Sequence, residues 1–440
     1  MAVNADPDRS PAGALEPVGV RDEATPLDAT APAAPDSSVV SLDAYVRAYV
    51  ARVRSGDSGL LPVVCGLVLI SVIFQVSNSH FLGVANLVNW LQQASLYMVM
   101  AMGIVFVLLL GEIDLSAGYV GLVGGAIAAE MLSGTHPWPL GLVIPIALLT
   151  TAAIGFGQGL LITRLGLPAF VVTLAGLLGW EGVLLLILGT GGTVPINDKY
   201  FTDIATGYFT NLTLSWVIVG ALVVIAAFVL WRRDNRRRSS GLVAPPVALT
   251  VMKIVAIAVA GTALVLLVNA NRSILKVAPI RGMPWFVLEV MGLLLIWTLF
   301  LGRTRPGRYI YAIGGNKEAA RRAGVSTKWI RTMGFTICSV NAGAAGMLIA
   351  GQSGGMATSI DGGQLVLYSI AAAVIGGTSL FGGRGKAIHG VLGGLVIAGI
   401  VNGMALTGLS AQLQYVITGL VLLVAVTIDA VSHRRADTTV

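Results

Sequence analysis

Long apolar segments, separated by short polar stretches, fill the chain from about residue 60 onward. About 20 apolar residues are needed to cross a bilayer as an α-helix. On that scale, about twelve candidate spans begin near Leu60, Leu91, Leu115, Leu140, Pro168, Leu212, Val247, Met283, Trp329, Gly363, Ala387 and Ala411. The pattern predicts an all-α, polytopic integral membrane protein.

Two places in this pattern are irregular. Only Gly111-Glu112-Ile113-Asp114 separates the second and third candidates, and the tenth, from Gly363, is short and rich in glycine. Either could be a broken or re-entrant helix, so we expect about 10–12 transmembrane helices. They would form one transmembrane domain over residues 43–435.

The composition agrees with a membrane protein. The chain is 55% hydrophobic and 11% charged, with a mean hydropathy of +0.84, whereas about 25% of a soluble domain is charged. Its 55 glycines suit close helix packing in lipid. Residues 1–42 and 436–440 are expected to be cytoplasmic tails, and the first lacks apolar periodicity and is expected to be disordered.

Positive charges set the expected orientation, because cytoplasmic loops carry an excess of Lys and Arg. With the N-terminus inside, the cytoplasmic segments hold Arg47, Arg52, Arg54, Arg164, the cluster from Arg232 to Arg238, the arginines from Arg303 to Arg331, Arg384, Lys386, Arg434 and Arg435. The external loops hold only Lys199, Arg272, Lys276 and Arg281. We therefore predict a plasma- or inner-membrane protein with both termini in the cytoplasm. The Arg232 cluster is typical of an anchor beside membrane lipid, and no nucleic-acid partner is expected.

The most polar internal stretch lies in the predicted cytoplasmic loop 303–330. Gly314-Gly315 is expected to break the chain, and Asn316 to cap a short helix from Lys317 to Ala323. Gly324 then supplies the stop. A short basic helix between two spans is suited to docking against a cytoplasmic partner, although a solvated loop fits the residues equally well.

Carboxylates inside or beside the spans have two readings. Glu112 and Asp114 form an ionisable pair, which at membrane depth is costly and by default functional. If the turn instead lies at the cytoplasmic edge, Asp114 or Ser116 only caps the following helix. Glu181, within the fifth span, is either a pathway residue or a packed hydrogen-bond partner.

Several other kinds of site are not expected. The cysteines lie inside apolar spans and the histidines are scattered, so we predict neither a disulfide nor a metal site. These residues are Cys65, Cys338, His80, His136, His389 and His433. The sequence around Gly385-Lys386 fails the Walker pattern for a phosphate loop. We predict no catalytic residue and no cofactor in this chain, and any ATP would be hydrolysed by a separate subunit.

The most specific motif is AAAVIGGTSLFGGRG at 371–385. It resembles the A-x-V-I-G-G-T-S-L-x-G-G-x-G element of ABC importer permeases of the ribose/xylose/galactose sugar class. GEIDLSAG at 111–118, with Glu112 where Gly is commoner, and GLPAFVVTL at 166–174 also resemble elements of that family. Loop 303–330 resembles its EAA-type coupling loop. The resemblance covers roughly 91–431, and the extra spans around the Arg232 cluster are similar to those of xylose-type permeases.

The resemblance implies an ABC importer permease fold that moves a monosaccharide, D-xylose or a related pentose or hexose, into the cytoplasm. It also implies a second copy of the permease, a cytoplasmic ATP-binding subunit and an external sugar-binding protein as partners. The residues implied to couple to the ATPase are Gly314, Asn316, Glu318, Ala319, Ala320, Arg321 and Gly324. The glycines expected in tight turns and helix contacts are Gly376, Gly377, Gly382, Gly383 and Gly385.

Two alternatives differ in energy source or in substrate. One is an ion-coupled secondary sugar transporter of about twelve spans, which would use buried carboxylates such as Glu130. The other is an ABC permease for another small solute, such as an amino acid. The candidates for lining a translocation pathway are Gln92, Gln93, Glu112, Asp114, Gln158, Glu181, Asn341, Gln352 and Asn402. For any one of the neutral candidates, we favour a hydrogen bond between helices over pathway lining.

Overall fold

The computed structural model describes residues 61–189, 192–240, 244–273, 279–410 and 412–420, and the single residues 47, 423 and 427. The tails expected over 1–42 and 436–440 lie outside these ranges. The described chain is almost entirely helical, apart from one small antiparallel sheet of two strands. The predicted helical membrane fold is confirmed.

The predicted spans correspond to helices of two lengths. The helices are α2 (Leu61–Ser77), α3 (Val84–Leu109), α4 (Ala117–Leu132), α5 (Leu140–Arg164), α6 (Ala169–Leu188), α8 (Leu212–Ser239), α9 (Val247–Asn269), α10 (Trp285–Arg303), α13 (Thr327–Ser353), α14 (Gly362–Ile375) and α15 (Ala387–Leu406). Over the described residues, 8 of them are long and apolar enough to cross a membrane, and α2, α4 and α14 are shorter. Residues 412–420 form a further helical segment.

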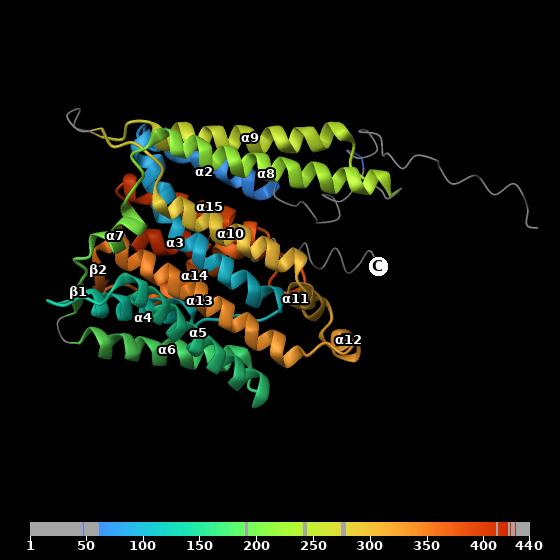
Figure 1. Ribbon diagram of the computed structural model, residues 1–440. Helices are drawn as coiled ribbons and strands as arrows, with labels where there is room; N and C mark the ends of the chain where they lie inside the picture. The colour runs from blue at the N-terminus through green and yellow to red at the C-terminus, as the bar shows by residue number, and fades with distance from the viewer. Residues whose placement is uncertain are drawn as a thin grey trace, which may run out of the picture.

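The helices form a bundle with a different set of short elements at each end (Figure 1). At one end lie α7 (Lys199–Thr206), β1 (Thr193–Pro195) and β2 (Gly355–Ala357), and at the other lie α11 (Arg305–Gly315) and α12 (Lys317–Arg322). We call these the α7 end and the α12 end. The centre of the bundle is made by α3 and α13, which pack on each other and on α4, α5, α14 and α15.

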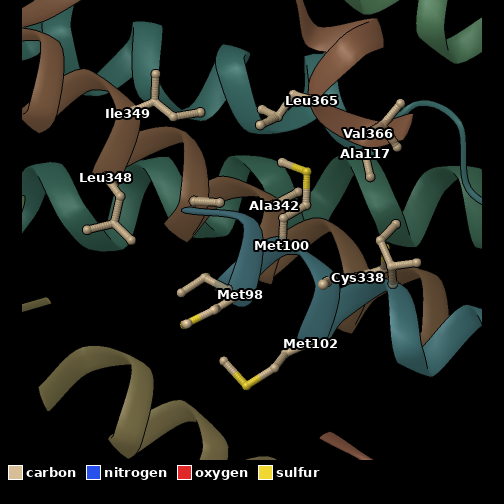
Figure 2. Close-up of a cluster of buried hydrophobic side chains, with 14 of the residues drawn as sticks. Met98, Met100, Met102, Ala117, Cys338, Ala342, Leu348, Ile349, Leu365 and Val366 are labelled. Carbon is tan, nitrogen blue, oxygen red and sulfur yellow. The ribbon is translucent and has the colours of Figure 1, made fainter. Parts of the chain in front are cut away.

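The core is apolar and depends on close backbone contact. Figure 2 shows Met100 of α3 beside Ala342 of α13, within one buried cluster. A Cβ added to Gly121 of α4 would lie 2.5 Å from the Ala342 carbonyl oxygen, and one on Gly125 would lie 2.6 Å from that of Gly346. Small residues that let backbones touch are how helices associate in lipid. Glycines of the sequence therefore allow close helix packing in the core.

Two helices begin inside the bundle instead of at one of its ends. With 16 and 14 residues, α4 and α14 are about 24 and 21 Å long, too short to span a bilayer. Gly121, one turn into α4, lies against Ala342 near the middle of α13, and the first residue of α14, Gly362, packs against Gly118 and Tyr119 of α4. The two irregular places in the sequence pattern are thus both helices that start beside each other within the bundle.

The helices α8 and α9 form a hairpin along one edge of the bundle (Figure 1). Its turn is fastened by Asp234, which accepts a hydrogen bond from Thr250 Oγ1 at 2.9 Å and pairs with Arg233 at 3.0 Å. Arg238 donates to Thr250 Oγ1 at 2.8 Å and to the Pro245 carbonyl at 2.9 Å. Figure 1 shows this turn, and with it the arginine cluster at the end of α8, at the same end of the bundle as α12.

Two boundaries differ from the sequence prediction. The helix α3 begins at Val84 and not near Leu91, because the bundle accommodates Asn86: its amide donates to Phe81 O at 2.9 Å and to Asn402 Oδ1 at 2.8 Å. The helix α11 continues through Gly314 and Gly315, and the expected break comes one residue later, where Asn316 has φ −157° and ψ 100°.

Candidate functional site

The short helix α12 has one inward and one outward side. As predicted, Asn316 Oδ1 caps it by accepting a hydrogen bond from Ala319 N at 2.9 Å, and Gly324, with φ 81°, follows its C-terminal end. Ala320 is 6% exposed and turned against the bundle, whereas the other residues of α12 are exposed. Ala320 therefore holds the helix on the bundle and is not part of its outer surface.

The outer side of α12 is charged. Arg321 and Arg322 approach the Glu318 carboxylate to 2.7 and 3.4 Å. Hydrogen bonds from Arg321 hold the pKa of Glu318 below its usual value. The acidic residue in the first turn and the basic residues in the last turn both complement the helix dipole. This exposed end of the molecule thus presents a short, rigid, charged helix.

The helix α11 joins α12 to the interior of the bundle. A Cβ on Gly314 would collide with the Leu109 carbonyl oxygen, at the end of α3, and with Gly383 N. Gly383 N donates to the same Leu109 oxygen at 2.9 Å, and Tyr311 Oη donates to Gly385 O at 2.8 Å. Three backbones therefore meet at Gly314: α11, the end of α3 and the loop between α14 and α15.

The loop between α14 and α15 holds the glycines singled out in the sequence. Gly377, Gly382 and Gly383 have φ values of 106°, 91° and 71°, a region that residues with a Cβ rarely adopt. A Cβ on Gly376 would collide with the His389 carbonyl oxygen of α15. The glycines thus give this loop both its turns and its close contact with α11 and α15.

An extended segment leads from the end of α3 into the bundle. Arg331 of α13 pairs with Glu112, and both side chains are largely buried, at 14% and 11% exposure. Two residues further along this segment, Asp114 Oδ1 accepts hydrogen bonds from Ser116 N at 3.0 Å and Ser116 Oγ at 2.6 Å. Gln158 Oε1 lies 3.1 Å from the same hydroxyl. Asp114 is fully buried, so it orders the start of α4 within the bundle and not at its edge.

The start of α14 uses the same local arrangement but is open. Asp361 Oδ1 accepts hydrogen bonds from Gly363 N at 2.8 Å and Gln364 N at 3.1 Å, and the Asp361 side chain is exposed. The Tyr119 ring of α4 lies against Gly362, the residue after Asp361, and Glu181 lies on α6 and is partly buried. Polar residues of α4 and α14 are therefore adjacent on this face.

A cavity of about 340 Å³ lies between α14 and residues 412–420, next to Asp361. Gln364 Nε2 donates to Tyr368 Oη at 2.7 Å. Longer contacts cross to the second helix: Tyr368 Oη lies 3.4 Å from Thr418 Oγ1, and Tyr415 Oη lies 3.5 Å from Gln364 Oε1. The cavity volume falls at the lower end of the roughly 300–1,000 Å³ of small-molecule sites.

The other predicted pathway residues make hydrogen bonds between helices. Gln352 donates to the Gln92 carbonyl at 3.0 Å, and Asn402 donates to Gln93 Oε1 at 3.3 Å. Asn341 is 1% exposed and accepts a hydrogen bond from an indole N–H of α10 at 2.9 Å. These contacts join α3 to α13, α3 to α15 and α10 to α13.

Residues 86–426 match the family model described as "Branched-chain amino acid transport system / permease component". The match runs from the first turn of α3 to beyond the helical segment at 412–420. The chain belongs to this permease family.

Three relatives illustrate the similarity of the permease to known proteins. It is 34% identical over 381 residues to the xylose transport system permease protein XylH of Escherichia coli K12, covering 85% of this chain and 92% of that protein. It is 35% identical over 391 residues to XylH of Haemophilus influenzae, covering 87% and 99%. It is 30% identical over 365 residues to the ribose import permease protein RbsC of Escherichia coli K12, covering 82% and 91%. No solved structure matches the chain. The permease is therefore a multi-pass membrane component of a transport system, and not an enzyme.

Sequence reasoning missed the polar residues around the cavity of the permease. The available signal was Asp361-Gly362-Gly363-Gln364, in which a carboxylate precedes a short glycine-rich span. The same kind of signal occurs at Asp114. Asp361 falls just before the predicted start of the tenth span at Gly363, so its carboxylate does not count among those inside the spans. The tyrosines resemble ordinary interface residues of a membrane helix.

Proposed function

We propose that this permease is the transmembrane subunit of an ATP-driven importer that moves a monosaccharide, D-xylose or a related pentose or hexose, into the cytoplasm. The observation that carries the proposal is the α11–α12 pair, exposed on one side and joined backbone to backbone with the end of α3 on the other. The xylose and ribose permeases among its relatives support a sugar substrate. The family description favours an amino acid as the second candidate.

In this proposal the α12 end faces the cytoplasm. Arg164, Arg303 and the Arg232 cluster end α5, α10 and α8 at that end, which agrees with the excess of positive charge in cytoplasmic loops. Lys199 begins α7 at the opposite end. The termini would then both be cytoplasmic, and a sugar-binding protein would deliver its cargo at the α7 end.

The coupling mechanism follows from what α12 touches. A separate ATPase subunit, which binds ATP and Mg, would grip the charged outer side of α12, while Ala320 holds the inner side on the bundle. A displacement of α11 cannot be absorbed at Gly314, because its backbone already contacts Leu109. It is passed to the end of α3 and on to the segment holding Glu112, which Arg331 links to α13. ATP-driven motion would thus reach the start of α4.

The partners of the permease would be the ATPase, the external sugar-binding protein and a second copy of the permease. A homodimer gives a two-fold ATPase one α12 helix for each of its nucleotide-binding halves. The absence of a Walker phosphate loop in the sequence is consistent with a division of labour in which this chain supplies only the membrane path and the docking helix.

The test is uptake into proteoliposomes that contain the permease and its ATPase, with the sugar-binding protein outside. We expect accumulation of labelled D-xylose only when ATP is present on the ATPase side, with no loss when proton and sodium gradients are collapsed. Uptake driven by an ion gradient without the ATPase would overturn the proposal. ATP-driven uptake of a branched-chain amino acid in place of any sugar would favour the second candidate.

A further inference from the structure

We propose that the cavity between α14 and residues 412–420 holds the transported solute during its passage, and that this solute is a neutral polyhydroxy compound of monosaccharide size. The inference rests on the proposed function and assigns the groups that the solute meets inside the membrane. They are Asp361, Gln364, Tyr368, Tyr415 and Thr418.

The exposed Asp361 carboxylate calls for a polar or aqueous neighbour at its end of this face, beside apolar lining residues such as Leu367. Its carboxylate is exposed although it stands at a helix start that lies inside the bundle, against Gly118 and Tyr119. An ionisable side chain at such a depth faces a water-filled space or a polar partner and not hydrocarbon. The chain between β2 and α14 is also non-helical, and such backbone is tolerated at membrane depth only when it is buried or lines an aqueous cavity.

The groups around the cavity suit a sugar. The Gln364 amide and the exposed Tyr415 hydroxyl offer donors and acceptors at the cavity, which match hydroxyl groups that themselves donate and accept. Behind them the Thr418 hydroxyl donates to the Gln414 carbonyl at 2.8 Å and can accept a further hydrogen bond. The two tyrosine rings add apolar surface for the C–H face of a sugar ring. The carboxylate of Asp361 would repel an anionic solute such as a sugar phosphate.

The existing hydrogen bonds across the cavity are long. The contacts of Tyr368 with Thr418 and of Tyr415 with Gln364 measure 3.4 and 3.5 Å, against about 2.7–2.8 Å for a well-made O–H···O bond. A solute hydroxyl could replace either contact at little cost. By contrast, the contacts at Asp114, at 2.6 and 3.0 Å, are short and enclosed, so that site offers no place for a solute.

The other interpretation is that these side chains only fasten residues 412–420 to α14. The two interpretations differ in what a variant does to coupling. A side chain that touches the solute affects how many sugar molecules move for each ATP hydrolysed. A side chain that only supports the fold lowers ATP hydrolysis and uptake together.

The experiment uses the complete transporter in proteoliposomes, with D-xylose as the probe, and measures uptake and binding-protein-stimulated ATP hydrolysis in the same sample. We expect Gln364→Leu to lower the sugar imported per ATP about tenfold, the equivalent of one hydrogen bond, with ATP hydrolysis within about twofold of wild type. Tyr415→Phe keeps the ring and removes one hydroxyl, so a fall of about threefold is expected.

The matched control is Leu420→Ala, on the same helix as Tyr415 and 57% exposed but outside the cavity. Its ratio of sugar to ATP should equal that of wild type. The cavity assignment would be overturned if both Gln364→Leu and Tyr415→Phe kept the wild-type ratio of sugar to ATP. A parallel loss of ATP hydrolysis and uptake in these variants would also overturn it. In either case, sugar uptake by the wild-type transporter would leave the proposed function standing. If the wild-type transporter imports no sugar, the proposed function and the assignment fail together.

Discussion

The starts of α4 and α14 are built in the same way and differ in their surroundings. In each, an aspartate oxygen accepts a backbone N–H two residues on, at 3.0 Å in Ser116 and 2.8 Å in Gly363. Asp114 is fully buried, whereas Asp361 is exposed beside a cavity. The local sequence therefore determines the turn. The helices packed around the turn determine whether its aspartate is buried and structural or exposed and able to line the proposed solute path.

The largest expected effect on stability concerns the buried ion pair of Glu112 and Arg331, in the segment that leads to the enclosed start of α4. Glu112→Gln leaves the Arg331 guanidinium buried without its counter-charge, and we expect a loss of about 3–5 kcal/mol in unfolding free energy, measured by denaturant titration in micelles. The double variant Glu112→Leu with Arg331→Met replaces the pair by apolar groups and should recover most of that stability. If Glu112→Gln is as stable as wild type, the pair does not hold this segment.

Adjacent glycines in α11 provide a matched pair for the contact with α3. A Cβ on Gly314 collides with Leu109, whereas one on Gly315 meets nothing within 4 Å. Gly314→Ala should therefore cost about 1–3 kcal/mol through overpacking and reduce ATP-driven uptake about tenfold or more. Gly315→Ala should leave uptake and stability unchanged. Equal uptake by the two variants would mean that α11 does not transmit motion at this contact.

The two aspartates should differ in what they contribute to stability. Asp114→Ala strands the buried Ser116 N–H and leaves the Ser116 hydroxyl only Gln158 Oε1 as an acceptor, at an expected cost of about 1–3 kcal/mol. Asp361→Ala removes only an exposed helix cap, which costs about 0.5 kcal/mol at such sites. The free energies of unfolding of the two variants test this difference. A loss at Asp361 as large as that at Asp114 would show that the α14 start is as enclosed as the α4 start.

The smallest effect concerns pH at α12. Because Arg321 lowers the pKa of Glu318 from the ordinary 4.5, the contribution of this pair is fully present above pH 4.5 and is lost as pH falls through the lowered value. Between pH 5.5 and 8 the Glu318 carboxylate does not titrate, so the protection of the amides at 317–324 against hydrogen exchange should stay constant over this range. In Glu318→Gln, protection at pH 7 should fall slightly. A wild-type change near pH 6 would point to another titrating group.

How far the sequence predicts this molecule depends on whether a feature is local. The spans follow from apolar runs, and the Asn316 cap and Gly324 stop of α12 follow from a few adjacent residues. The burial of Asp114 does not, because its partner Ser116 is held by Gln158 of α5 and the pair is enclosed by several helices. Helix–helix packing between distant segments decides that burial, and no nearby residue encodes it.

The same reason explains the missed cavity. Tyr415 and Thr418 meet Gln364 and Tyr368 only after α15 and the following helix fold back along α14. In the sequence these residues are isolated polar positions in two different spans. The burial of Ala320 also depends on tertiary contact, because the sequence of α12 alone does not indicate which of its alanines faces the bundle.

The central claim, that the α14 start opens to the solute path while the α4 start is closed, can be tested by thiol labelling of the assembled transporter. In a Cys65→Ser background, buried Cys338 reports on the α4 start, and Leu367→Cys, 47% exposed, reports on the cavity (Figure 2 shows Cys338 in the core). We expect a water-soluble maleimide to label Leu367→Cys and not Cys338, and the labelling to slow when the transporter is supplied with D-xylose. Rapid labelling of Cys338, or labelling of Leu367→Cys that D-xylose leaves unchanged, would contradict the account.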